Sequence, residues 1–498
     1  MIVQPSTLLS VLRDRFGLES LRPIQDSVIR RLLGIGEPAG DALVVLPTGS
    51  GKSLCYQLPA LALREAARDA GEPSGVTLVF SPLIALMEDQ VAALRKKGID
   101  AAYVNSTLSR GEREKRYTAL AAGKYELIYA TPERMATPEF AEALAKVPGG
   151  VRLLAIDEAH CISKWGHDLR PAYADVGGFR EQLGSPRTVA LTATATGAVR
   201  EDIRSVLIAS EREMPLFASG IDRPNLALEA AEVFGDDDKL QAIRETATAA
   251  GGVGVVYFAL IKDLERFAQL LRRALPGLDH AVYHGRLDPK QKKRVYRRFM
   301  EGSADDPLLL CATNAFGMGV DKPDLRYIVH AQVPGSVEAY YQEVGRAGRD
   351  GGASACRLLY HQEDLAIQQE FCEWANPSAD LLASIMATVE HRYAGRDGHA
   401  TFDADDIRLD VVGKGHAHGK SGGRIEYALI VLEKLGAIER VDPEGRYRFA
   451  GELPDDAIDA EAIEAKRRRD LTRLLDVVKL ARSGDVRGFV LDYFDLDR

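Results

Sequence analysis

The stretch that decides the fold is Leu153-Leu154-Ala155-Ile156-Asp157-Glu158-Ala159-His160. Its four apolar residues are typical of a buried strand in a parallel sheet, and two adjacent carboxylates follow at the carboxyl end of that strand. Open α/β sheets bind their ligands outside the carboxyl ends of the strands. We therefore expect an α/β fold in which Asp157 and Glu158 lie at a binding edge suited to phosphate chemistry.

The loop that follows these carboxylates, up to Pro171, combines an aromatic ring with positive charge. Trp165 can stack on bases, while His167 and Arg170 can pair with phosphates. One segment is thus expected to contact both a nucleotide and a nucleic acid.

A phosphate loop precedes this stretch in the chain. The apolar run from Leu43 to Leu46 indicates a strand, and Pro47 to Ser53 opens the next helix. Its backbone from Thr48 through Gly49, Ser50 and Gly51 would approach phosphate oxygens, Lys52 would reach the β- and γ-phosphates, and the Ser53 hydroxyl would bind Mg²⁺. Asp157 would complete the magnesium site, with Glu158 orienting or deprotonating the attacking water. The strict pattern has Gly or Ala where Leu46 stands, so a chance glycine-rich turn is the alternative.

Two polar residues near the N-terminus are candidates for base recognition. Gln25 follows the turn at Arg22-Pro23 and can present its amide to the edge of an adenine ring. A solvated glutamine on a helix is the alternative interpretation.

Strands alternate with helical stretches along two thirds of the chain, which predicts parallel, doubly wound sheets. The expected strands are 43–46, 77–80, 101–104, 127–130, 153–156 and 188–191 in a first domain, and 253–258, 281–284, 308–311, 327–330 and 355–360 in a second. Hydroxyls just after strands, at Ser81, Thr131, Thr192 to Thr196 and Thr313, could hold a phosphodiester backbone. Helix caps or turns are the alternative for each of them.

The second predicted domain has no phosphate loop but carries a pair of arginines, Arg346 and Arg349, three residues apart. On one helical face they could insert into a nucleotide held by the first domain and neutralise charge on the γ-phosphoryl group. Surface ion pairs are the alternative.

These motifs, in this order, resemble the superfamily-2 helicases. The resemblance rests on Arg22-Pro23-x-Gln25, Pro47 to Ser53, Asp157 to His160, Thr192 to Thr196, Ala312 to Pro323 and Gln342 to Gly351. Residues 157–173 and 316–323 resemble the RecQ DNA helicases specifically. The resemblance implies ATP hydrolysis with Mg²⁺, 3′ to 5′ DNA unwinding and DNA sensing by the loop at Trp165. It also implies catalytic roles for Gln342, Arg346 and Arg349, and nucleotide contacts for Arg22, Gln25 and Asp321. Leu18 and Leu169 depart from the family pattern, which often has aromatic residues there.

Composition limits the kind of nucleic-acid binding. The 498-residue chain has a net charge of −9, which argues against coating nucleic acid through bulk charge. The most basic run, at Lys290, Lys292, Lys293, Arg294, Arg297 and Arg298, is either a solvated helix face or a local DNA contact. No apolar run is long enough for a membrane span, so we expect a cytoplasmic, nucleoid-associated protein with no membrane partner.

We expect four regions: a first RecA-like domain at 1–215, a second at 216–360, a linker and winged-helix-like domain at 361–462, and a helical remnant of a zinc-type subdomain at 463–498. Helix 423–435 with strands 437–440 and 447–449 resembles a winged helix, and 413–423 is typical of a flexible linker. The five cysteines are scattered, and only Cys372 follows residue 360, so we expect no zinc and a remnant that packs by apolar contacts alone.

The predicted function is ATP-driven 3′ to 5′ translocation on single-stranded DNA, with unwinding of duplexes in repair or recombination. Forked DNA is an expected substrate, and single-stranded-DNA-binding or repair proteins are possible partners. The alternatives are a translocase or RNA helicase that does not unwind DNA, and a nucleotide-dependent scaffold that has lost hydrolysis. The intact Lys52, Glu158, Arg346 and Arg349 argue against a scaffold.

Overall fold

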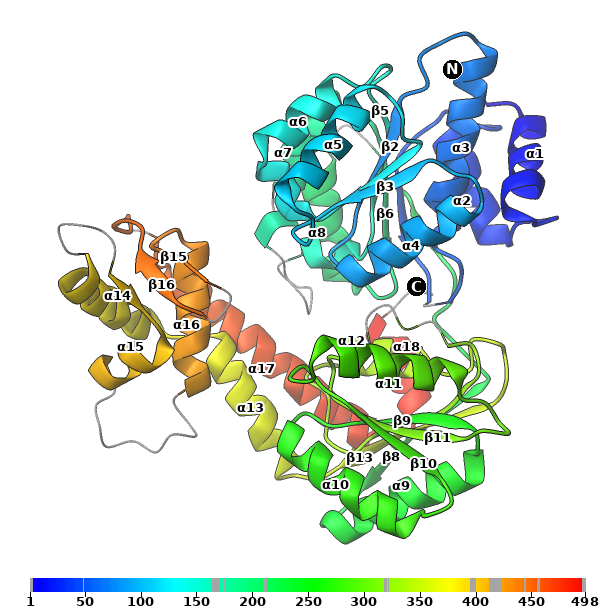
Figure 1. Cartoon of the computed structure of the whole chain (residues 1–498). Helices are drawn as coiled ribbons and strands as arrows, with labels where there is room; N and C mark the ends of the chain where they lie inside the picture. Colours follow the sequence, from blue (N-terminus) through cyan, green and yellow to red (C-terminus); the bar gives the residue numbers. More distant parts are fainter. Residues whose placement is uncertain are drawn as a thin grey trace.

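The protein consists of two α/β units and a smaller third module (Figure 1). The structure is a computed structural model that describes residues 3–47, 49–163, 171–173, 175–208, 213–317, 320, 322–394, 400–411, 422–442, 445–454 and 457–494.

The first unit is a parallel sheet with helices on both faces, as predicted. Its seven strands run in the order β3 (Ala101–Val104), β4 (Leu127–Ala130), β2 (Val76–Phe80), β5 (Val151–Ile156), β6 (Arg187–Thr192), β1 (Ala42–Val45) and β7 (Leu216–Ala218). Its helices are α1 (Pro5–Phe16), α2 (Pro23–Leu33), α3 (Leu54–Asp69), α4 (Ile84–Lys96), α5 (Arg110–Ala121), α6 (Pro138–Ala145), α7 (Val176–Gln182) and α8 (Gly197–Leu207), with short 3₁₀ turns at Pro132–Ala136, Ala159–Ile162 and Pro171–Tyr173. Because β7 pairs with β1, this sheet continues three residues past the expected boundary at 215.

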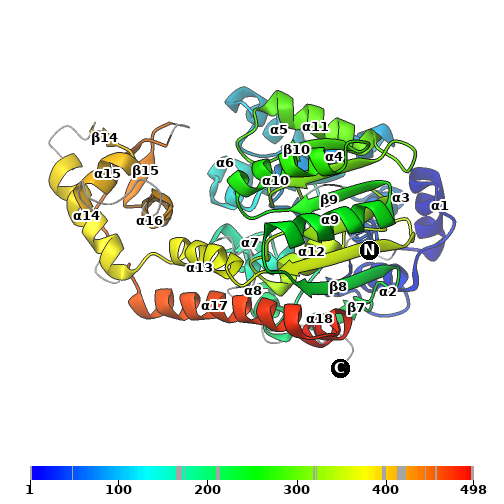
Figure 2. The same ribbon diagram turned by 90° about the horizontal axis from the view of Figure 1, so that it is seen from below.

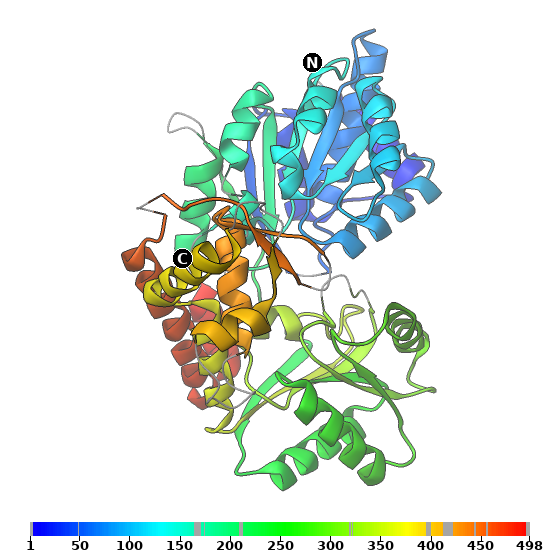
Figure 3. The ribbon, with the colours of Figure 1, turned by 60° about the vertical axis from the view of Figure 1, so that its left-hand side comes forward.

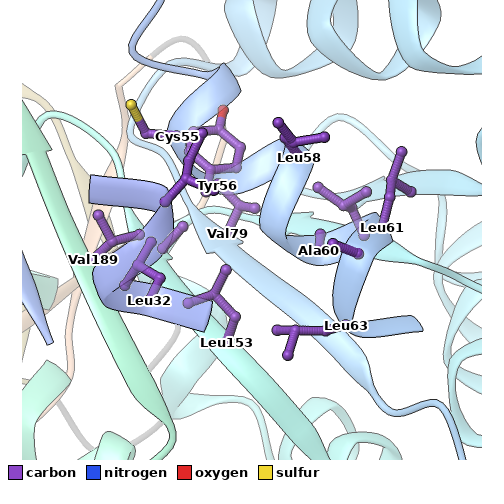
Figure 4. Close-up of a cluster of buried hydrophobic side chains, with 14 of the residues drawn as sticks. Leu32, Cys55, Tyr56, Leu58, Ala60, Leu61, Leu63, Val79, Leu153 and Val189 are labelled. Carbon is purple, nitrogen blue, oxygen red and sulfur yellow. The ribbon is translucent and has the colours of Figure 1, made fainter. Parts of the chain in front are cut away.

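An apolar core holds the binding edge of this sheet in place. Leu32 of α2, and Tyr56 and Leu58 of α3, pack over Leu153 and Val189 of the central strands (Figure 4). These side chains are at most 1% exposed. The core therefore fixes α3, which follows the phosphate loop, relative to β5, which delivers the carboxylates.

The second unit has a six-stranded parallel sheet. The strand order is β10 (Asp279–Tyr283), β11 (Leu308–Ala312), β9 (Val253–Tyr257), β12 (Leu325–His330), β13 (Ser354–Tyr360) and β8 (Leu226–Glu232), with helices α9 (Asp236–Ala250), α10 (Ile261–Ala274), α11 (Pro289–Glu301) and α12 (Val337–Val344).

Two features at the start of this unit differ from expectation. Strand β8 was not predicted, because its sequence is rich in Ala and Glu, but it pairs with β13 over seven residues at the sheet edge. The acidic run Asp236 to Asp238 is expected from its sequence to be a loop between the domains, but it forms the first turn of α9. Carboxylates are favoured there because the N-terminal end of a helix carries partial positive charge.

The third module has a core of its own. Helices α14 (Ala379–Tyr393), α15 (Ala404–Val411) and α16 (Gly422–Lys434) pack with an antiparallel sheet in the order β14 (Thr401–Phe402), β16 (Tyr447–Phe449), β15 (Ile438–Arg440). The predicted helix and two strands are confirmed, and β14 is an additional strand. Most of the expected linker at 413–423 lies outside the described residues, and the winged-helix assignment stays a prediction.

Two helices connect the third module to the second unit. Helices α13 (Asp364–Ala375) and α17 (Ala460–Arg482) lie side by side, and α17 leads to α18 (Val486–Phe494) against β8 (Figure 2). Figure 3 brings the third module forward. The C-terminal residues Val477, Leu480, Val490 and Phe494 belong to the core of the second unit.

The expectation that the C-terminal helices pack by apolar contacts alone is wrong. The Lys466 ammonium donates to Asn376 Oδ1 at 2.7 Å, and the Tyr493 hydroxyl donates to Glu338 Oε1 at 2.9 Å. The partners are 90 and 155 residues away in the chain, so local sequence patterns could not reveal them.

The described residues contain neither a membrane-spanning helix nor a cluster of metal ligands. No described helix is both long enough and apolar enough to cross a membrane. No group of three or more His, Cys, Asp or Glu side chains within the described ranges could hold a metal ion.

Candidate active site

The phosphate loop lies between β1 and α3, as predicted. Gly49 and Gly51 have φ angles of 78° and 81°, in the left-handed region that favours glycine. A β-carbon at Gly51 would stand 2.7 Å from Nε2 of Gln25, so a larger residue there would displace the Gln25 amide. Ser50 closes the turn by donating from Oγ to the Pro47 carbonyl at 2.6 Å. Thr48 lies outside the described residues.

Lys52 lies at the centre of this site. Its ammonium donates to the Leu46 carbonyl at 3.0 Å, across the base of the loop. Burial lowers the pKa of Lys52, while Glu158 and Asp157 oppose that shift. A second anion, such as a phosphate, would further favour the charged form.

Arg22 and Gln25 contact the phosphate loop itself. The Gln25 amide donates from Nε2 to the carbonyls of Ser50 at 3.1 Å and Gly51 at 3.2 Å, and its Oε1 accepts from the Arg22 backbone at 3.1 Å. Arg22 Nη1 donates to the same Ser50 carbonyl at 3.1 Å. Both ends of the Gln25 amide are thus engaged within the chain, which differs from the expected display to a ring edge.

Asp157 follows β5 directly and is held by its neighbours. Its backbone N–H donates to the Phe80 carbonyl at 2.8 Å, and the Tyr173 hydroxyl donates to its carbonyl at 3.2 Å. Ser81 Oγ donates to its Oδ2 at 3.4 Å. Burial and the neighbouring Glu158 raise the pKa of Asp157 to about 7. A half-buried pair of carboxylates of this kind is stabilised by a cation, which fits the Mg²⁺ assignment.

We expect this pKa shift to make the free energy of unfolding pH-dependent. The folded-state pKa of Asp157, about 7, lies above its ordinary value of 3.8, so the folded protein binds this proton more tightly. Stability present below pH 3.8 should therefore be lost as pH rises through 7. Denaturant unfolding of wild type and Asp157→Asn across this window checks it. In the variant, the free energy of unfolding should vary less with pH across this window. The same pH dependence in both proteins would contradict the raised pKa of Asp157.

Glu158 has an unusual backbone conformation. Its φ is 50° and its ψ is 47°, a left-handed geometry that costs a non-glycine residue about 1–2 kcal/mol. Strain of this kind is common at functional sites. Glu158 Oε2 lies 3.4 Å from His160 Nδ1.

His160 connects the carboxylates to the loop after β6. Its Nδ1 lies 3.0 Å from the Thr192 hydroxyl, and that hydroxyl donates to the Thr194 carbonyl at 2.9 Å. Nδ1 of His160 therefore lies near both the Thr192 hydroxyl and Glu158 Oε2. Thr192, the first residue of the segment expected to hold DNA, thus contacts the 3₁₀ turn that directly follows Asp157 and Glu158.

The two arginines of the second unit diverge. They do not share a helical face, because α12 ends at Val344 and the chain turns at Gly348, whose φ is 56°. Arg346 is 7% exposed and donates from Nη1 to the Gly317 carbonyl within its own unit. Arg349 instead reaches the first unit: a β-carbon at Gly49 would lie 3.2 Å from its Cγ and Cδ. Gln342 lies half-buried in the last turn of α12.

Models of two protein families match the chain. The DEAD/DEAH box helicase family matches residues 22–203, and the helicase conserved C-terminal domain matches residues 238–351. The ATP-dependent DNA helicase RecQ of Bacillus subtilis is 41% identical over 369 residues, 73% of this chain and 58% of that protein. The probable ATP-dependent DNA helicase RecS of the same organism is 34% identical over 443 residues, 89% of this chain and 82% of that protein.

The chain belongs to the RecQ family of superfamily-2 helicases. It spans a little over half the length of the RecQ proteins it matches, 58% in Bacillus subtilis and 56% in Haemophilus influenzae. The Mycobacterium smegmatis helicase Lhr, solved with single-stranded DNA and AMP-PNP, superposes with a TM-score of 0.52 at 18% identity, covering 91% of this chain and 60% of Lhr. At that identity the likeness concerns the fold alone.

The hydroxyls expected to line a DNA path in this RecQ-family chain are buried. Ser81, Thr131 and Thr313 are 2%, 6% and 6% exposed, each just after the end of a strand. Ser81 donates to Asp157, and Thr131 precedes a 3₁₀ turn. Their role in DNA binding stays a prediction.

Asp321 and the sensing residues Trp165, His167 and Arg170 lie outside the described residues.

Sequence reasoning missed a buried polar network behind the phosphate loop. Gln57 Nε2 donates to Gln90 Oε1 at 2.8 Å and to the Tyr129 hydroxyl at 3.1 Å, and Tyr129 donates to the Tyr56 hydroxyl at 3.4 Å. These residues lie on α3, α4 and β4. The one available signal was a Tyr-Gln pair inside the apolar first half of α3.

Proposed function

We propose that this chain is an ATP-dependent DNA helicase that moves 3′ to 5′ on single-stranded DNA and unwinds duplexes in repair or recombination. The observation that carries the proposal is the meeting of two units at one site. Lys52, Asp157 and Glu158 come from the first unit, and Arg349 of the second lies against Gly49 of the phosphate loop. The family membership and the DNA helicase names of the relatives support it.

Each residue of the site has a role that its position supports. Lys52 and the backbone N–H groups of the loop would bind the triphosphate, and Ser53 with Asp157 would hold Mg²⁺. Bound there, Mg²⁺ neutralises charge on the phosphates. Glu158 would accept a proton from the attacking water, and its contact with His160 orients its carboxylate. Arg349 would neutralise charge on the γ-phosphoryl group as it transfers.

The contact between the units supports a coupling between hydrolysis and movement. Because Arg349 belongs to one unit and Gly49 to the other, bound ATP would favour closure of the two units, and product release would favour opening. Alternate closing and opening would shift the grip of each unit on a DNA strand. Contacts among Glu158, His160 and Thr192 give a route between the ATP site and the loop expected to contact DNA.

Replacing Lys52 is expected to abolish both hydrolysis and unwinding. Wild type should hydrolyse ATP faster with single-stranded DNA and should unwind forked and 3′-tailed duplexes but not 5′-tailed ones. Lys52→Ala should do neither, because the triphosphate loses its main cation. Parallel assays with RNA separate the alternatives: stimulation by RNA alone would favour an RNA helicase, and DNA stimulation without strand separation a translocase.

The basic helix α11 carries exposed cations that are placed to contact DNA phosphates. Three of its six cations contact other groups of the protein: Lys292 donates to the Gly285 carbonyl at 2.7 Å, Arg298 pairs with Asp279 and Asp306, and Arg297 lies 3.9 Å from Glu301. Lys290, Lys293, Arg294 and Arg297 are exposed and spaced along one helical face. We propose that this face binds DNA phosphates.

Neutralising part of this face should weaken DNA binding in a salt-dependent way. For Lys293→Gln/Arg294→Gln, we expect the slope of log K against log salt for single-stranded DNA to fall by about 1.4, or ~0.7 per lost phosphate contact. The matched control is Arg467→Gln/Arg468→Gln on α17, where both cations pair with Glu464. Equal slopes in the two double variants would show that α11 is only a solvated face.

The third module and the setting of the protein complete the proposal. We interpret the module as a winged helix that docks on duplex DNA. A β-carbon at Gly423, near the start of α16, would lie 2.9 Å from the Trp374 ring of α13, so α13 covers that end of α16.

We further propose that the protein is cytoplasmic and nucleoid-associated, that it contains no zinc, and that it binds single-stranded-DNA-binding or repair proteins. Metal analysis of the purified protein tests the zinc assignment.

A further inference from the structure

A third arginine, Arg223, donates hydrogen bonds to the loop that carries Arg346 and Arg349. We call residues 345–352 the arginine loop. The Arg223 guanidinium donates from Nη1 to the Gly345 carbonyl at 2.7 Å, and from Nη2 to the carbonyls of Ala347 at 2.8 Å and Gly348 at 2.7 Å. One planar cation therefore holds three backbone carbonyls on either side of Arg346. A lysine could not reproduce this fork of donors.

Asn225, two residues further along the chain, holds the same loop. Its Nδ2 donates to the carbonyls of Gly348 at 2.9 Å and Gly352 at 3.0 Å. The fit is tight, because a β-carbon at Gly348 would stand 2.5 Å from that nitrogen and 2.6 Å from the Gly352 carbonyl oxygen. Gly348 lies between the two arginines, so the position of its backbone sets the direction in which Arg349 leaves the loop.

Helix α18 contacts the segment that carries Arg223 and Asn225, whose bonds to the arginine loop we call the brace. Arg487 pairs with Asp222 and donates to the Leu226 carbonyl, on either side of Arg223 and Asn225. Helix α18 also contacts α12, which leads into the arginine loop: the rings of Phe494 and Tyr341 are 5.3 Å apart. Tyr341 in turn donates to the Ile221 carbonyl at 2.6 Å. Segment 221–226 is thus held between α18 and the arginine loop.

We propose that Arg223 and Asn225 are positioning residues for ATP hydrolysis, and that α18, through Arg487, keeps them in place. They hold the arginine loop so that Arg349 reaches the phosphate loop of the first unit. This inference rests on the proposed function, since it assigns Arg349 to the transferring phosphoryl group. It makes the C-terminal helix part of the catalytic apparatus, although α18 does not itself contribute a group to the reaction.

The test compares Arg223→Ala, Arg223→Lys and Arg487→Ala in the full chain with a matched control, Arg482→Ala. Arg482 also joins the C-terminal helices to the second sheet, through Glu232 at 3.6 Å and the Tyr360 ring at 5.1 Å, and both of these partners lie outside segment 221–226 and the arginine loop. We expect Arg223→Ala to lower kcat for DNA-stimulated hydrolysis about 10²-fold, the effect of misplacing a catalytic group by about 1 Å. Affinity for a fluorescent AMP-PNP analogue should change little. Arg223→Lys and Arg487→Ala should show smaller losses in kcat.

Hydrogen exchange of the arginine loop gives a readout that does not depend on activity. Amides of residues 345–352 should exchange faster in Arg223→Ala and Arg487→Ala and at the wild-type rate in Arg482→Ala. Unchanged exchange and unchanged kcat in Arg223→Ala would overturn the brace, as would equal losses of kcat, analogue affinity and melting temperature in the Arg223 and Arg482 variants. If Arg349→Ala keeps full hydrolysis while exchange responds as expected, the proposed role of Arg349 fails and the brace is only structural.

Discussion

Arg349→Ala is expected to lower kcat for ATP hydrolysis by about 10³-fold or more, the usual contribution of an arginine that neutralises a transferring phosphoryl group. Its side chain crosses from the second unit to Gly49 of the phosphate loop. Because this contact matters most as charge develops on the phosphate, binding of a nucleotide analogue should be affected far less than kcat. Steady-state hydrolysis with saturating single-stranded DNA, together with analogue titration, measures both.

Two comparisons sharpen this prediction. Arg346→Ala should also reduce the melting temperature, because Arg346 is buried and bonded to the Gly317 carbonyl inside the second unit. Arg357→Ala is the control, since Arg357 lies on β13 and pairs with Glu245 at 3.6 Å, away from the site. If Arg349→Ala and Arg357→Ala have the same kcat, Arg349 takes no part in hydrolysis.

Glu158→Gln is expected to have the second large effect, a loss of about 10²- to 10⁴-fold in hydrolysis with ATP binding retained. The amide has the shape of the carboxylate but cannot accept a proton from water. Asp157→Asn should behave differently, losing Mg²⁺-dependent nucleotide binding itself, because Asp157 is the carboxylate assigned to the metal. Measuring analogue binding with and without Mg²⁺ separates the two variants.

The two variants test whether Glu158 and Asp157 have separate roles, as general base and as Mg²⁺ ligand. A Glu158→Gln protein that still hydrolyses ATP at the wild-type rate would move the general base elsewhere. Equal loss of nucleotide binding in Glu158→Gln and Asp157→Asn would show that the two carboxylates act as one metal site.

The sequence by itself determined the local parts of the site. The phosphate loop was predictable because strand, glycine turn and helix are contiguous, and Gly49 and Gly51 have the left-handed backbone that such a turn requires. The carboxylates after β5 were predictable because a short apolar strand ends directly before them. Two parallel sheets followed from the alternation of strands and helices, although the Ala- and Glu-rich strand β8 carried no such signal.

Only the tertiary structure decided where the side chains point. Arg346 and Arg349 looked equivalent in sequence, yet one is bonded inside its own unit and the other reaches Gly49. Arg223 meets the arginine loop across about 120 residues of chain, and Arg487 meets Asp222 across 265. The reason is physical: backbone conformation depends on near neighbours in the chain, whereas the partner of a side chain depends on the packing of distant elements. Asp157 and Glu158 were therefore readable from the sequence, and so was the pair of arginines, but only the packing decided that Arg349 is the one that reaches the phosphate loop.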